Sequence, residues 1–212
     1  MDRFLSGLEQ VWHEALGIWV SGGWCMPPLA LLAFATFALG IHIQLRLREK
    51  EFRAVPEAEW RRWIAVPSRR EGPIGRILSS VTGTGSIERQ AIAFADVRAT
   101  ELVPFTRDLK VMKICVAAAP LIGLLGTVTG MLGTFDALAS GAGGDKTMGL
   151  VAKGISEALV TTETGLVVAL PGLFFRYLLG RKFDEYGAFL AHLETVCNQH
   201  LHRQLSARGS AA

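Results

Sequence analysis

The sequence predicts an all-α membrane protein with three transmembrane helices, the N-terminus outside and the C-terminus in the cytoplasm. Half of the 212 residues are hydrophobic and only 19% are charged, whereas charged residues make up about 25% of average soluble domains. Three apolar stretches are each long enough to cross about 30 Å of hydrocarbon as a helix. The basic residues gather in two segments that these stretches place on one side.

Each predicted span contains a recognisable apolar run. The first holds the run from Met26 to Ile43, and the second a charge-free stretch from Ile114 to Phe135. The third is closed by Arg176 but contains two acids, Glu157 and Glu163. The predicted bounds of the spans are residues 24–45, 111–137 and 154–178.

Arginine and lysine set the expected orientation. Of the 22 basic residues, 14 lie between Arg46 and Lys113, and five lie from Arg176 onward. Loops rich in these residues stay in the cytoplasm. The predicted cytoplasmic segments are therefore residues 46–110 and 179–212, and the predicted periplasmic loop is residues 138–153.

Residues 1–22 are predicted to form an amphipathic helix in the outer membrane interface rather than a cleavable signal. Charged residues such as Glu9 and Glu14 interrupt the apolar run that a signal needs. A frayed terminus is the alternative. The apolar positions recur at steps of three and four, as an interfacial helix requires; they are Phe4, Leu8, Val11, Trp12, Ala15 and Trp19.

The cytoplasmic segments are predicted to be helical. Pro56, Pro67, Gly72-Pro73 and residues 82–85 break the first segment into short helices. From Ser86 a helical pattern runs on toward the second span. The last segment carries an apolar stripe that we expect to pack on the cytoplasmic helices, made of Phe183, Tyr186, Leu190, Leu193, Cys197, Leu201 and Leu205.

Small residues form one face on each of the last two spans. In lipid, such faces let helix backbones approach closely, so we expect them to pack helix on helix. Pro120 and Pro171 are expected to kink these helices. The small residues are Gly123, Gly126, Gly130 and Gly133 in the second span and Gly165, Ala169 and Gly172 in the third.

Hydroxyl side chains lie near the middle of the same two spans. Thr127 is in the second span, and Thr161 and Thr162 are in the third. Because the two helices run in opposite directions, Thr127 and Thr162 are expected at a similar depth. A lone threonine in a membrane helix usually bonds its own backbone, but the cluster predicts one polar layer.

Two acids accompany these threonines. An ionised carboxylate at the centre of a spanning helix costs about 2.5–3.5 kcal/mol on insertion scales. Our hypothesis is that Glu163 faces a hydrated cavity or a seam between subunits; the alternative is a protonated acid bonded to a neighbouring helix. Glu157 lies nearer the outside, where interfacial water or Lys153 is within reach.

Two stretches resemble the ExbB/TolQ/MotA proton-channel family. The first is Ala-Pro-Leu-Ile-Gly-Leu-Leu-Gly-Thr-Val-Thr-Gly-Met at 119–131. The second combines Gly-Ile-Ser-Glu-Ala-Leu-Val-Thr-Thr at 154–162 with Gly-Leu-Val-Val-Ala-Leu-Pro at 165–171. Flagellar stator members usually have a fourth span, so the three predicted spans resemble ExbB or TolQ more closely. The residues Gly-Thr-Val-Thr-Gly and Leu-Val-Thr-Thr resemble ExbB more than TolQ.

The resemblance implies a pentamer in the bacterial inner membrane whose second and third helices line a pore. An ExbD-like partner would occupy the pore, and a TonB-like or TolA-like protein would receive the work of the proton motive force. By position, Thr127 and Thr162 match the family's pore-lining threonines, and Glu157 matches an acid of the family. Glu163 departs from the pattern, in which a small residue follows the threonine.

Other functions fit the residues less well. No glycine-rich stretch follows a strand or ends as a phosphate loop does, and His200 and His202 lack a third metal ligand. We therefore expect no enzyme activity, no catalytic residue, no metal and no cofactor. Topology explains the arginines without nucleic acid. A substrate transporter component and a passive scaffold remain the alternatives.

Overall fold

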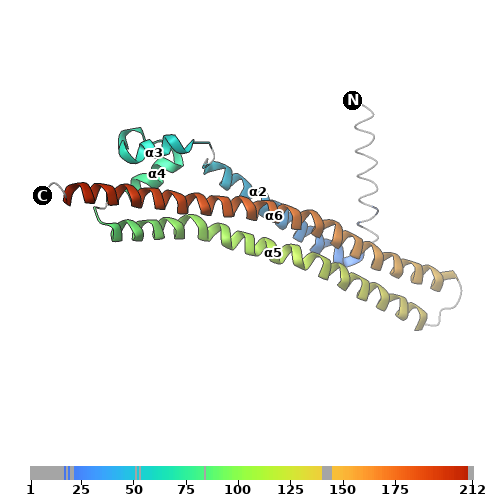
Figure 1. The fold of residues 1–212 in the computed structure, drawn as a ribbon. Coiled ribbons are helices and arrows are strands. Elements are labelled where there is room, and N and C mark those ends of the chain that lie inside the picture. The colour runs from blue at the N-terminus through green and yellow to red at the C-terminus, as the bar shows by residue number, and fades with distance from the viewer. Residues whose placement is uncertain are drawn as a thin grey trace, which may run out of the picture. The chain divides into compact units, whose positions relative to one another are not determined.

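The computed structural model describes residues 17, 19, 22–50, 52, 54–83, 85–139 and 145–209, without the side chains of 145, 146, 208 and 209. The predicted interfacial helix 1–22 lies outside these residues, apart from Gly17, Trp19 and Gly22. Figure 1 labels the α-helices. The elements are η1 (Gly23–Cys25), α2 (Met26–Glu49), α3 (Glu57–Ala65), η2 (Pro67–Arg69), α4 (Gly72–Val81), α5 (Ile87–Ala139) and α6 (Asp145–Gly209).

Among the described residues, three helices are long and apolar enough to cross a membrane. They contain the three predicted spans, and each continues beyond the predicted bounds. Hydrocarbon thickness limits the apolar part of a helix but not the helix itself. Helical residues therefore reach into the predicted loop 138–153, because α5 ends at Ala139 and α6 begins at Asp145. Pro120 and Pro171 lie inside these helices without ending them.

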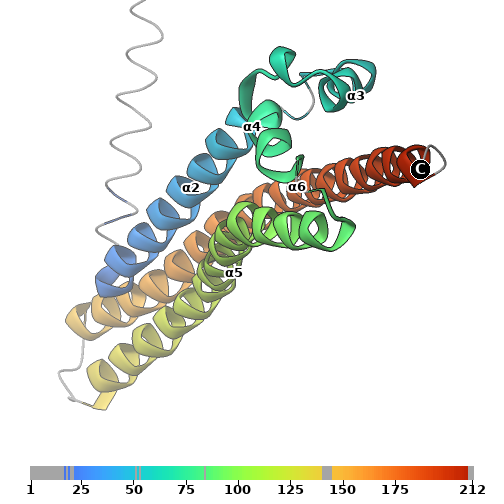
Figure 2. The same cartoon turned by 90° about the vertical axis from the view of Figure 1, so that its left-hand side faces the viewer.

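The chain forms two compact units, which we describe separately. The first is made from residues 1–38 and 111–175 and holds the apolar parts of the long helices. The second is made from residues 39–110 and 176–212 and holds both arginine-rich segments. Within the first unit, α5 runs antiparallel to α6 (Figures 1 and 2).

The second unit confirms the predicted sequence of short helices followed by a long one. Pro56 caps α3, Pro67 begins η2, and Gly72-Pro73 begins α4. Trp60 of α3 packs edge-on against Phe189 and His192 of α6. The predicted stripe on α6 is buried at Tyr186, Leu190, Leu193 and Cys197.

Arg70 ties the ends of the short helices together. The last carbonyls of a helix have no N–H partner within it. The Arg70 guanidinium donates to the carbonyls of Trp63 (2.9 Å) and Ile64 (3.4 Å) at the end of α3. It also donates to the carbonyl of Leu78 (3.3 Å) and the hydroxyl of Thr82 (2.7 Å) at the end of α4. One side chain thus serves two helix ends.

Replacing Arg70 with alanine is expected to destabilise α3 and α4 together. Losing a charged donor to several acceptors costs about 2 kcal/mol, so amide hydrogen exchange in both helices should accelerate about thirtyfold. Arg70→Lys should rescue little, because an ammonium lacks the planar fork of donors. Arg69→Ala, at the neighbouring exposed position, is the matched control. Unchanged exchange in Arg70→Ala would contradict this role.

Candidate functional site: one face of α5 and α6

The contact between α5 and α6 is made by small residues. A Cβ atom built on Gly126 would lie 2.5 Å from the Cβ of Thr161, and one on Gly123 would lie 2.9 Å from the Thr161 carbonyl oxygen. No side chain fits between the helices at these positions. The backbones approach closely, as small-residue faces permit in lipid.

The same close approach continues along both helices. Gly130 lies against Gly154 and Ala158, and Gly165 lies against Ala119. Gly133 differs, because a Cβ atom there would meet nothing within 4 Å. Gly172 lies against Val116 and Thr36. Ala169 belongs to a buried apolar cluster that consists of Met26, Leu29, Ala119 and Ala169, with Ile122 and Val168 packed on it.

Helix α2 covers one side of the α5–α6 pair. Gly23, in η1 directly before α2, meets Glu157, and Thr36, further along in α2, meets Gly172. Sequence numbers rise together in these contacts, so α2 runs parallel to α6. Ile122 of α5 and Val168 of α6 also pack on the cluster that contains α2 residues. These contacts mark the α2 side of the pair.

Thr127 and Thr162 lie on the opposite side. At about 100° per residue, Thr127 is about 140° from Ile122 around α5, and Thr162 is about 140° from Glu157 around α6. For antiparallel helices, equal rotations in the direction of the chain lead to the same side of the pair. Both hydroxyls therefore share the face away from α2, and both residues are half-buried in the protomer.

The two hydroxyls lie about one helical turn apart along the helix axes. The Thr162 hydroxyl donates to the carbonyl of Gly123 across the helix contact (3.1 Å) and to that of Ala158 (3.3 Å). The Thr127 hydroxyl donates to the Leu124 carbonyl at 2.6 Å. Because Thr162 lies opposite Gly123, Thr127 is about one helical turn away along the axis.

Thr161 takes a different position from its neighbour. It is fully buried, with 0% of its surface exposed, against Gly126. Its hydroxyl donates to the carbonyls of Glu157 (3.0 Å) and Ala158 (3.1 Å) in its own helix. The structure therefore separates two adjacent threonines, one between the helices and one on the face away from α2.

Glu163 is exposed on α6, about a quarter turn beyond Thr162, on the side that points away from α5. Large apolar side chains surround it on the helix surface, including Leu159 at 66% exposure and Leu170 at 67%. Among the described residues, no hydrogen bond or ion pair reaches the Glu163 carboxylate. Glu157 is half-buried and lies on the α2 side.

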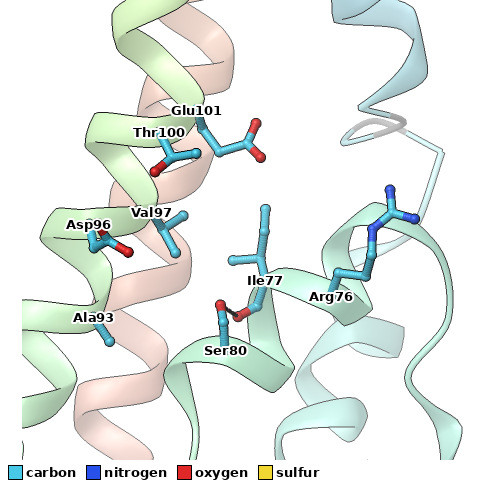
Figure 3. Close-up of a pocket in the computed structure, with 8 residues that line it drawn as sticks. All are labelled: Arg76, Ile77, Ser80, Ala93, Asp96, Val97, Thr100 and Glu101. Carbon is cyan, nitrogen blue, oxygen red and sulfur yellow. Dashed lines mark hydrogen bonds between the residues drawn. The ribbon is translucent and has the colours of Figure 1, made fainter.

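A hollow of about 260 Å³ lies in the second unit, between α4 and α5 (Figure 3), and has both polar and apolar residues in its lining. Glu101 forms one edge, pairs with Lys50 and accepts a hydrogen bond from the Tyr186 hydroxyl at 3.1 Å. Burial, with the nearby Glu101 charge, raises the pKa of Tyr186 above its ordinary value. The hollow is lined by Arg76, Ile77, Ser80, Ala93, Asp96, Val97, Thr100 and Glu101.

This cluster was not predicted from the sequence. Lys50, Glu101 and Tyr186 come from three segments, and Tyr186 was placed only in an apolar stripe. A tyrosine within an apolar helical stripe is itself a signal, because its hydroxyl needs a partner when it is buried. Burial likewise raises the pKa of the Cys197 thiol to about 12, so this cysteine is protonated at neutral pH.

Comparisons with known proteins match the part of the chain that carries this face. The model of the MotA/TolQ/ExbB proton channel family matches residues 86–191, which is half of the chain. A stretch of 101 residues is 40% identical to the biopolymer transport protein ExbB-like 1 of Synechocystis, over 45% of this chain and 40% of that protein.

Two further relatives are similar to part of this chain. The biopolymer transport protein ExbB homolog of Methanothermobacter thermautotrophicus is 35% identical over 118 residues, covering 54% of this chain and 41% of that protein. The Tol-Pal system protein TolQ of Haemophilus influenzae is 39% identical over 92 residues, covering 42% and 38%. The chain thus spans about two fifths of the length of these relatives.

Proposed function

Because this chain belongs to the MotA/TolQ/ExbB proton channel family, we propose that it is the ring-forming subunit of a proton-driven motor in the bacterial inner membrane. Five copies surround a central pore, with the N-terminus in the periplasm and the C-terminus in the cytoplasm. Spanning helices of an ExbD-like partner occupy the pore. A TonB-like protein receives the work and drives outer-membrane transport.

The position of Thr127 and Thr162 carries this proposal. Helix α2 covers one side of the α5–α6 pair, and both hydroxyls lie on the other side. A ring that places α2 toward the lipid turns the two hydroxyls toward its centre. The family match supports the same pair of helices, because it includes all of α5 and α6 as far as residue 191.

Threonine hydroxyls suit a conduit for protons. Each hydroxyl donates and accepts hydrogen bonds, so it can hold water beside a titrating group without adding a charge. Glu163 lies about a quarter turn from Thr162 and supplies a carboxylate at the same depth. A proton that crosses 100 mV releases about 2.3 kcal/mol, and several such steps can turn or shear a partner helix within the ring.

The similarity to TolQ supports a second candidate within the same mechanism. In that case the motor acts on a TolA-like protein and serves envelope integrity. The two candidates differ in the protein that receives the work, so a gene for a TonB-like or a TolA-like protein beside this gene distinguishes them. A passive scaffold or a transporter component differs in mechanism and is tested next.

Replacing both Thr127 and Thr162 with valine is expected to abolish uptake that depends on the proton motive force. Valine keeps the shape of threonine, so expression and assembly should stay near normal although the bond from Thr162 to the Gly123 carbonyl is lost. Valine cannot hold water beside a titrating group. The measurement is uptake of an outer-membrane substrate into cells with and without a protonophore. Thr129→Val, in the same helix with a hydroxyl bonded to the Leu125 and Gly126 carbonyls, is the matched control. Normal uptake in the double variant would support the scaffold.

A further inference from the structure

The short helix η1, which leads directly into α2, is packed against the side chain of Glu157. Gly23 adopts a φ of +61°, a conformation that side-chain-bearing residues rarely adopt. A Cβ atom built on Gly23 would collide with the Glu157 carboxylate and lie 3.1 Å from the Glu157 Cγ. The carboxylate thus occupies the space in which a side chain of residue 23 would lie.

Neighbouring residues extend this contact, and we call the whole of it, formed by Gly22 and Gly23 against Glu157 and Val160, the Glu157 seat. A Cβ atom on Gly22 would lie 2.6 Å from the Met26 sulfur and 3.3 Å from Val160, one turn along α6 from Glu157. Cys25, Met26 and Leu29 are at most 2% exposed. The first turns of α2 are therefore closely packed, and Glu157 and Val160 form the part of α6 that they meet.

Glu157 does not lie on the face of the α5–α6 pair that carries Thr127 and Thr162. It lies about 140° around α6 from Thr162, on the side that α2 covers. Among the described residues no ion pair joins it to Lys153 or to any other base. A negatively charged group beside the N-terminus of a helix is electrostatically favourable, and the Glu157 carboxylate lies beside Gly23, where the helical run begins.

We infer that Glu157 is a positioning residue that seats the start of α2 on α6, and that it acts through the shape and the oxygen atoms of its side chain rather than by exchanging a proton. The inference rests on the proposed function only for its transport readout. It assigns proton transfer in this chain to the opposite face of α6 and gives Glu157 a structural task within the protomer.

Cys25 offers a native probe of this seat. In a variant whose only cysteine is Cys25, made by replacing Cys115 and Cys197, the buried thiol should react slowly with a maleimide in the purified full chain. Glu157→Ala should raise the labelling rate at least tenfold by emptying the seat, and Gly23→Ala should do so by crowding it. Glu163→Ala, which alters an exposed acid on another side of α6, should leave the labelling rate unchanged.

The variant Glu157→Gln distinguishes a role for the shape of the Glu157 side chain from a role for its proton exchange. Glutamine fills the same space with an oxygen atom but cannot titrate, so both slow labelling and proton-dependent uptake should be retained. Slow labelling in Glu157→Ala and Gly23→Ala would overturn the seat. Loss of uptake in Glu157→Gln, with Cys25 still protected, would overturn the positioning role in favour of proton transfer. The labelling rates do not depend on transport, so failure of the proposed function leaves this test intact.

Discussion

Replacing Gly126 with leucine is expected to separate α5 from α6 and to abolish the proposed five-copy assembly. Gly126 lies against Thr161 so closely that even a Cβ atom would be 2.9 Å from the Thr161 Cγ2. A leucine side chain must push the helices apart, and the cost of overpacking is about 1–3 kcal/mol or more. Separation also breaks the hydrogen bond from Thr162 to the Gly123 carbonyl.

Native mass spectrometry and thermal unfolding of the purified complex measure this effect. The unchanged protein should appear as five copies, and Gly126→Leu as dissociated chains with a lower unfolding temperature. Gly133→Leu is the matched control, because a Cβ atom at Gly133 meets nothing within 4 Å and the protomer should unfold at the original temperature. A stable five-copy assembly in Gly126→Leu would show that the α5–α6 contact is not what holds the protomer together.

Much of the fold follows from local sequence signals. Proline and glycine marked the breaks that precede α3, η2 and α4, because these residues restrict the backbone wherever they occur. The apolar runs placed the three long helices. The ends of those helices were harder to predict, because the hydropathy change marks the edge of the hydrocarbon and not the last helical residue.

Which side of a helix each polar residue faces was harder still. Thr161 and Thr162 are adjacent and chemically identical, yet one is buried against Gly126 and the other lies on the face away from α2. Only the position of α2 distinguishes the two sides of the pair, and that position depends on contacts such as Gly23 with Glu157, 134 positions apart in the sequence. The hydrogen bonds of Arg70 were not predicted for a similar reason, because they depend on where α3 and α4 end relative to each other.

Glu163→Gln is expected to reduce proton-dependent uptake at least tenfold while leaving insertion and assembly normal. Glu163 is exposed on a spanning helix beside large apolar side chains. An ionised acid there costs about 2.5–3.5 kcal/mol, so glutamine should insert into the membrane at least as well. A loss of function without a loss of protein therefore reports on the proton that glutamine cannot release.

The alternative role makes the opposite prediction for the same variant. A protonated acid that only bonds a neighbouring helix is a hydrogen-bond donor, and the glutamine amide replaces that donor, so uptake would survive in Glu163→Gln. Glu163→Asp keeps a titrating group on a shorter side chain and should retain part of the uptake. Thr164→Val, next in sequence and bonded to the Val160 carbonyl at 2.8 Å, controls for a general loss of polarity. A greater loss of uptake in Glu163→Gln than in Glu163→Asp, with normal uptake in Thr164→Val, thus places proton transfer at this carboxylate. Glutamine already matches the shape and the hydrogen bonding of the acid, and Thr164→Val controls for local polarity.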